Sequence, residues 1–236
     1  MRYLHPVLMS EAFVASGIYT VIGLGETVVA EESWTFHEFP DGAWKIRVDH
    51  DRRMSGDASI LIEAWRAPES AGAHIERFDI SAFGPNDAPV QHVRSTYSVV
   101  GDSLEVGRTV DRGERVYESI ALAGSYVLHP GGVLFSGLAL AEQMDSTVPL
   151  PVLNANWLFE RETGFQINEL KWDVAADGDS SQTIDGMLRT GVKWFGSIND
   201  VTLNAVVDEH GILLAGQIGD EYISLNRYAR RSVHNQ

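Results

Sequence analysis

Residues 92–100 read HVRSTYSVV, and this alternation of apolar and polar side chains decides the fold class. Residues two apart point to the same side of an extended chain, so Val93, Tyr97 and Val99 share one face. The polar residues around them, such as Arg94, share the other face. This segment is therefore expected to form a β-strand with one core face and one wetter face.

The same period of two recurs in residues 75–82 and in residues 201–207. Between such runs, turn signals rich in Gly, Asp and Pro arrive at short intervals. They include Pro40-Asp41-Gly42, Gly84-Pro85-Asn86-Asp87, Gly101-Asp102, Asp111-Arg112-Gly113 and Gly219-Asp220. Because Gly and Asp tolerate the backbone angles of hairpin turns, this spacing predicts a meander of antiparallel strands.

A sheet with this many strands must curl or split in order to bury its faces. We therefore expect an all-β protein with one large, highly curved antiparallel sheet, either a half-barrel or an open barrel. One or two short helices are expected, at Pro6–Ser16 and Leu138–Met144. Residues 1–236 are expected to form a single β-rich domain, and the main alternative is two packed sub-barrels joined near Met144–Asn156.

The charge of the chain disfavours several classes of partner. With 33 acidic and 18 basic residues, the formal net charge is −15, and the basic residues come in pairs at most. Such a field repels nucleic acid and anionic membranes. No Cys is present, so disulfides and thiolate metal sites are excluded. The apolar stretch Pro6–Gly25 is interrupted by Glu11, so we expect no membrane insertion and a cytoplasmic location.

Motifs of catalysis and cofactor binding are weak in this sequence. No Gly-x-Ser-x-Gly nucleophile elbow occurs, and Gly23-Leu24-Gly25 lacks the pattern of a phosphate loop. The best strand pair for a metal is His74-x-Glu76, but a metal needs a third ligand that the sequence does not place. We expect no cofactor and no metal, and the sequence identifies no catalytic residue.

Two parts of the chain resemble a known group of proteins. The first is Gly17-x-Tyr19-x-Val21, Gly25, Glu32-x-Trp34-x-Phe36 and Trp44-x-Ile46. The second is Val207-Asp208-x-x-Gly211-Ile212-Leu213 followed by Tyr222–Tyr228. This opening and this closing resemble bacterial half-barrel proteins of unknown function, similar to lipoprotein carriers and putative glycolipid-binding proteins. The resemblance implies a curved sheet around an apolar groove, which holds acyl chains in the carriers.

The expected function is therefore binding of a hydrophobic or amphipathic small molecule in the groove of the sheet. Aromatic residues are expected to wall the groove, and polar tips are expected to hold a head group. The candidate residues are Trp34, Trp44, Arg47, Tyr97, His129 and Trp157. Two alternatives stay open: an enzyme for a small polar substrate inside the sheet, and a structural or interaction module. The sequence leaves the ligand and the oligomeric state undetermined.

Overall fold

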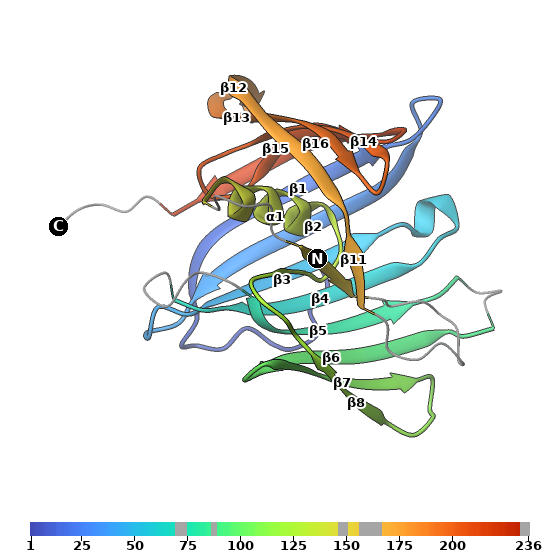
Figure 1. Cartoon of the computed structure of the whole chain (residues 1–236). Helices are drawn as coiled ribbons and strands as arrows, with labels where there is room; N and C mark the ends of the chain where they lie inside the picture. The colour runs from blue at the N-terminus through green and yellow to red at the C-terminus, as the bar shows by residue number, and fades with distance from the viewer. Residues whose placement is uncertain (69–74, 86–88, 146–150, 156–166, 232–236) are drawn as a thin grey trace.

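Strands make up most of the chain in the computed structural model, which describes residues 1–68, 75–85, 89–145, 151–155 and 167–231 (Figure 1). The first strands are β1 (Ala12–Ile22), β2 (Val28–Glu38), β3 (Trp44–Asp51), β4 (Ser59–Arg66), β5 (Ile75–Phe83), β6 (His92–Val100), β7 (Ser103–Val110), β8 (Val116–Ala121) and β9 (Val127–His129). The later strands are β10 (Val152–Ala155), β11 (Ile167–Leu170), β12 (Trp172–Ile184), β13 (Met187–Ile198), β14 (Val201–Val207), β15 (Leu213–Ile218) and β16 (Glu221–Arg230). A 3₁₀ turn, η1 (Arg53–Ser55), follows β3, and one α-helix, α1 (Val133–Asp145), follows β9.

Thirteen strands form one antiparallel sheet in the order β12-β13-β14-β15-β16-β1-β2-β3-β4-β5-β6-β7-β8. Strand β16 pairs with β1, so the end of the described chain lies beside its beginning. The outermost strands, β8 and β12, do not pair with each other, and the sheet is therefore open. These features confirm the expected all-β fold with a large curved antiparallel sheet.

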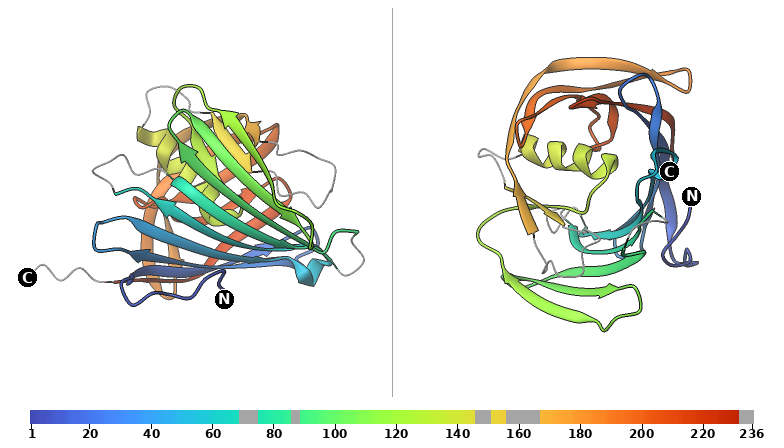
Figure 2. Two further views of the ribbon diagram at one scale, coloured as in Figure 1. Left: turned by 90° about the horizontal axis from the view of Figure 1, so that it is seen from below. Right: turned by 90° about the vertical axis from the view of Figure 1, so that its right-hand side faces the viewer.

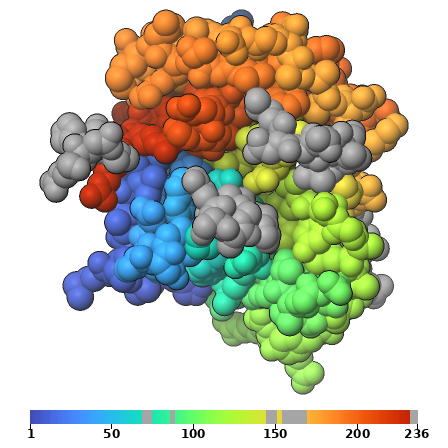
Figure 3. Space-filling view, turned by 60° about the vertical axis from the view of Figure 1, so that its left-hand side comes forward, coloured from blue at the N-terminus to red at the C-terminus, as the bar shows by residue number. Residues whose placement is uncertain are grey.

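The sheet curls strongly around its own concave side (Figure 2). Bulges contribute to this curvature because an extra residue on one strand increases the local twist and bend. The register shifts at Ile18/Tyr19 between β1 and β16, and at Ala176/Asp179 between β12 and β13. The later strands form a band above β1–β3, with β6–β8 at the opposite end (Figure 3). We call the concave side, which carries Trp34, the inner face.

Helix α1 lies inside the curve of the sheet, as the right-hand view of Figure 2 shows. Its sequence, VLFSGLALAEQMD, is apolar nearly all round, which is typical of a buried helix. Its buried apolar residues are Val133, Leu134, Phe135, Leu138, Ala139 and Leu140. The expected helix at Leu138–Met144 is confirmed, but it starts earlier. The interior of the sheet is therefore filled largely by this helix.

The prediction of a helix at Pro6–Ser16 is wrong, because β1 begins at Ala12 and the residues before it form no helix. Tertiary pairing explains the difference. Strand β1 lies between β2 and β16, and its alternate residues Ala15, Tyr19 and Val21 are buried on the inner face. Hydrogen bonding on both sides and burial of one face favour the strand over a weak local helix preference.

Strands from both sides of Met144–Asn156 belong to the same large sheet, since β1–β8 and β12–β16 are continuous through the β16–β1 pairing. Part of that segment forms β10, which pairs with β9 and β11 in a small three-stranded sheet. Residues 146–150 and 156 lie outside the described residues.

A close backbone contact fixes helix α1 against the loop between β14 and β15. A Cβ atom on Gly137 would lie 2.5 Å from the carbonyl oxygen of Gly211 and 2.9 Å from the amide nitrogen of Leu213. Backbone atoms cannot yield as a flexible side chain can. Glycine at position 137 therefore lets the helix approach the sheet closely.

We expect Gly137→Ala to destabilise the protein. Overpacking of a core typically destabilises a protein by about 1–3 kcal/mol. The higher helix propensity of Ala relative to Gly stabilises it by about 1 kcal/mol. The net loss in the free energy of unfolding should be up to about 2 kcal/mol, measured by urea denaturation. A gain in stability, as Gly→Ala gives in an open helix, would show that the contact is absent.

Candidate functional site

The N-terminal end of helix α1 is held by a buried carboxylate from strand β2. Glu32 is wholly buried, and its two carboxylate oxygens accept hydrogen bonds from the amides of Val133 at 2.8 Å and Leu134 at 2.7 Å. Its Oε2 also lies 2.8 Å from Nδ1 of His50 on β3. An anion at a helix N-terminus satisfies free amides and complements the helix dipole. Glu32 therefore fixes the helix inside the sheet.

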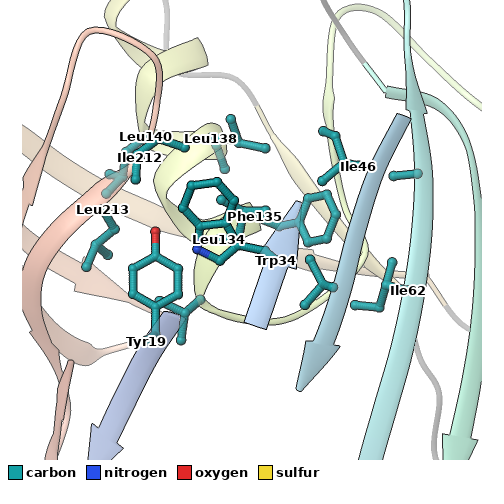
Figure 4. Close-up of a cluster of buried hydrophobic side chains, with 14 of the residues drawn as sticks. Tyr19, Trp34, Ile46, Ile62, Leu134, Phe135, Leu138, Leu140, Ile212 and Leu213 are labelled. Atoms are coloured by element: carbon teal, nitrogen blue, oxygen red, sulfur yellow. The ribbon is translucent and has the colours of Figure 1, made fainter. Parts of the chain in front are cut away.

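An aromatic row lines the inner face beside α1, and Figure 4 shows two of its members, Tyr19 and Trp34. Tyr19 lies 6.1 Å from Trp34, Trp34 lies 5.3 Å from Phe36, and Phe36 lies 5.8 Å from Trp44, measured between ring centroids. Gly17 makes room for this row, because a Cβ at that position would meet the Trp34 ring at 2.3 Å. The row runs from the middle of β1 to the start of β3.

A small apolar pocket lies between helix α1 and the sheet. Its apolar walls come from β5, from the β9 region and from the helix. The lining residues are Arg66, Ile75, Tyr126, Val127, Leu128, Phe135, Leu138, Ala139 and Glu142. The cavity volume is about 30 Å³, which is room for about two water molecules.

A β-bulge shapes this pocket. Trp65 pairs with Arg77, but the next residue, Arg66, pairs with Ile75, so Glu76 is the extra residue on β5. The extra residue reverses the side-chain alternation of β5 and directs Ile75 to the inner face. Without it, Ile75 would point away from the pocket that it lines.

Arg66 and Glu142 place charge at one side of the pocket. Their side chains form an ion pair of 3.4 Å and are 19% and 32% exposed. The guanidinium of Arg66 also lies 5.8 Å from the ring centroid of Trp44, within the range of a cation–π contact. The pocket thus combines an apolar wall with a half-buried cation, an arrangement that suits an amphipathic ligand.

A second cluster of charges lies on the outer face, under the N-terminal segment. Arg47 is 1% exposed; its Nη2 lies 2.9 Å from Oε1 of Glu11, and its Nε lies 3.3 Å from Oε1 of Glu63. Lys45 and His5 bind the other oxygen of Glu63 at 2.8 and 2.9 Å. We call Glu11, Lys45, Arg47 and Glu63 the outer charged cluster.

The outer charged cluster changes the acidity of its members. Burial alone would raise the pKa of Glu11, but hydrogen bonding and charge from Arg47 lower it overall. Burial would also raise the pKa of Glu63, and hydrogen bonds from Lys45 and His5 lower it instead. The pKa of His37, which lies 3.1 Å from Arg47, is lowered by burial and by the positive charge of that guanidinium. The carboxylates are therefore held ionised by their partners.

The structure separates the six residues that the sequence suggested. Trp34, Trp44 and Tyr97 lie on the inner face, where Tyr97 stacks on Phe78 at 4.4 Å. Phe36 lies between Trp34 and Trp44 in the aromatic row.

The remaining candidates do not join this set. Arg47 lies on the opposite face from Trp34, because Trp34 pairs with Val48 and Arg47 pairs with Thr35. The expectation that Arg47 holds a head group in the same groove is therefore corrected. His129 on β9 is buried, with Nε2 at 3.2 Å from Oγ of Ser136 on α1. Trp157 lies outside the described residues.

Sequence reasoning missed Arg66 and Glu142. Both residues are ordinary surface types, and their meeting depends on the internal position of helix α1. One signal was available: Arg66 follows the alternation of Ile60, Ile62 and Ala64, so an inward cation was predictable from β4. The position of its partner Glu142 on the helix was not predictable from the sequence.

Some functional features are absent from the described part of the chain. No helix there is both long and apolar enough to cross a bilayer. No group of three or more His, Asp or Glu side chains there is arranged to hold a metal ion. In the strand pair His74-x-Glu76, His74 lies outside the described residues.

The fold defines an open, strongly curved antiparallel sheet around an internal helix, a β-barrel-like arrangement. Among solved structures, the chain is similar to a β-barrel-like protein of the domain of unknown function DUF1849 from Brucella abortus, with a TM-score of 0.55. The similarity covers 94% of this chain and 99% of that one, at 9% sequence identity. No protein-family model and no curated protein matches the sequence.

This similarity concerns the fold alone. It agrees with the expected resemblance to curved-sheet proteins of unknown function. It does not support the more specific comparison with lipoprotein carriers.

Proposed function

We propose that this protein binds a small amphipathic molecule with an anionic head group, in the pocket between helix α1 and strands β4 and β5. The observation that carries the proposal is the position of Arg66. Its guanidinium borders a pocket whose other walls are mostly apolar, including Phe135 and Leu138. An acidic head group would pair with Arg66 while an apolar tail contacts the helix.

The two ends of α1 are held differently, which favours ligand entry at the C-terminal end. The N-terminal end is held by charge-assisted hydrogen bonds to buried Glu32. The last turns carry Glu142, whose ion pair with Arg66 is partly exposed. Such exposed pairs contribute only about 0–1 kcal/mol. An anionic ligand competing for Arg66 would release Glu142 at little cost.

The size of the pocket requires such a release. A volume of about 30 Å³ is too small for an acyl chain. If Glu142 moves away from Arg66, the last turns of α1 can shift outward and enlarge the space beside Leu138. Binding by this route is an adjustment of the helix end, with the Glu32 anchor unchanged.

We expect Arg66→Gln to weaken binding of a fluorescent fatty-acid analogue by about 10- to 100-fold. The reason is loss of a charge-assisted hydrogen bond worth about 1.5–3 kcal/mol. The measurement is fluorescence titration of purified protein, with unlabelled fatty acid as competitor.

Arg77→Gln is the matched control for this titration. Arg77 also lies over a Trp ring, at 4.8 Å from the Trp65 centroid, and also pairs with a carboxylate, Asp79, at 3.1 Å. Unlike Arg66, it lies on the outer face, because it pairs in register with outward-facing Trp65. Its variant should bind the probe as the wild type does. Equal affinity in both variants and the wild type would exclude Arg66 as the head-group site.

A further inference from the structure

Two buried hydrogen-bond donors meet on the inner face without an acceptor. Tyr19 is 0% exposed and Trp34 is 1% exposed. Within the described residues, neither the Tyr19 hydroxyl nor Nε1 of Trp34 has a hydrogen-bond partner of acceptable geometry. The backbone of Leu213 approaches the Tyr19 oxygen and favours its ionised form, as a donating amide does. The phenolic hydrogen is therefore still without an acceptor.

The two donors share one place in the fold. The rings are 6.1 Å apart between centroids. Figure 4 shows the Tyr19 hydroxyl directed toward helix α1, and the Trp34 nitrogen on the edge of the ring that faces Tyr19. The side chains around them, including Leu134 and Leu213, are apolar. An acceptor oxygen within hydrogen-bond distance of both atoms would satisfy both donors.

The cost of this arrangement points to a missing partner. Each buried donor left unpaired costs about 1–3 kcal/mol, and buried polar groups in folded proteins nearly always have a partner. Glu32 already accepts from the helix amides and contacts His50, and Asp208 accepts from the Tyr228 hydroxyl. A buried water molecule or a ligand oxygen would supply the acceptor, and only the ligand would also contact the apolar wall.

Nearby negative charges select the kind of acceptor. Burial raises the pKa of Tyr19 well above its ordinary value, and the charges of Glu32 and Asp208 raise it further. Both carboxylates would repel a second anion at this position, whereas a neutral oxygen meets no such repulsion. An apolar wall with two donors thus suits a neutral carbonyl or hydroxyl oxygen.

We propose that Tyr19 and Trp34 form a binding site for the neutral carbonyl or hydroxyl oxygen of a small apolar ligand. The site stands apart from the pocket at Arg66, whose lining includes neither residue. It takes uncharged ligands, whereas the pocket at Arg66 takes anions, so either site can exist without the other.

The test is thermal denaturation of the full chain with three six-carbon probes: hexan-1-ol, hexane and hexanoate. We expect hexan-1-ol to raise the melting temperature of the wild type by several degrees more than hexane does. Hexanoate, which is an anion, should not raise the melting temperature by binding at Tyr19 and Trp34. Tyr19→Phe should reduce the difference between hexan-1-ol and hexane, because the alcohol oxygen loses one of its two donors.

Trp34→Phe gives a second, independent loss of a donor if Tyr19→Phe folds poorly. Arg66→Gln is the control, and it should keep the full response to hexan-1-ol. Conversely, Tyr19→Phe should keep the response to the fatty-acid probe. Failure of the proposal for Tyr19 and Trp34 can therefore be distinguished from failure of the proposal for the pocket at Arg66. An equal response to hexan-1-ol and hexane in the wild type would overturn the assignment. A hexan-1-ol response that persists in both donor variants would overturn it too.

Discussion

Glu32→Met should lower the free energy of unfolding by about 3–5 kcal/mol, the typical cost of removing one partner of a buried charged network. The substitution keeps the volume of the side chain but removes the acceptor for the amides of Val133 and Leu134. Those amides and the ring of His50 would remain buried without their partner. Chemical denaturation followed by tryptophan fluorescence measures the loss.

Glu31→Met is the matched control for this prediction. Glu31 precedes Glu32 on the same strand but is exposed on the outer face. Its variant should stay within about 0.5 kcal/mol of the wild type, as surface substitutions usually do. If Glu32→Met and Glu31→Met were equally stable, Glu32 would not anchor the helix.

Arg47→Met should cost about 3–5 kcal/mol, because Glu11 and Glu63 would stay buried without their guanidinium partner. The control is Arg94→Met, since Arg94 is exposed on the outer face of β6 and its removal leaves no buried charge. A loss for Arg47→Met no greater than for Arg94→Met would contradict the role of the outer charged cluster.

The same variant should change how stability depends on pH. In the wild type, the folded-state pKa values of Glu11 and Glu63 lie below the ordinary 4.5. Their stabilisation is therefore present above that value and is lost as the pH falls below it. Without Arg47, burial at Glu11 loses its main offset and the pKa of Glu11 rises, so protonation of Glu11 stabilises the variant as the pH falls, whereas Lys45 and His5 still bind Glu63. The gap in stability between wild type and Arg47→Met should narrow from pH 7 to pH 4.

The strands and their faces were predictable because each depends on local alternation. Residues 92–100 are an example: Val93 and Tyr97 are buried, and Arg94 is exposed. The open curved sheet followed from the number of such runs. The face of Arg47 was also predictable, because it alternates with the apolar Ile46 and Val48 on β3.

Features that depend on distant contacts could not be predicted. The burial of Arg47 depends on the N-terminal segment, which supplies Glu11 and was expected to be helical. The apolar run at Val133–Leu140 is typical of a buried helix, but the surface that buries it is set by contacts distant in the sequence. The meeting of Arg66 with Glu142 depends on that helix position as well.

Native mass spectrometry of gently purified protein tests the central claim most directly, namely that an amphipathic molecule binds beside helix α1. The wild type should carry one bound amphipathic molecule per chain. Ala139→Leu, which fills the pocket at a buried lining position, should lose it. Ala229→Leu makes the same change at an exposed position of β16 and should keep it. A wild-type chain without any bound molecule, together with no displacement of the fatty-acid probe, would contradict the account.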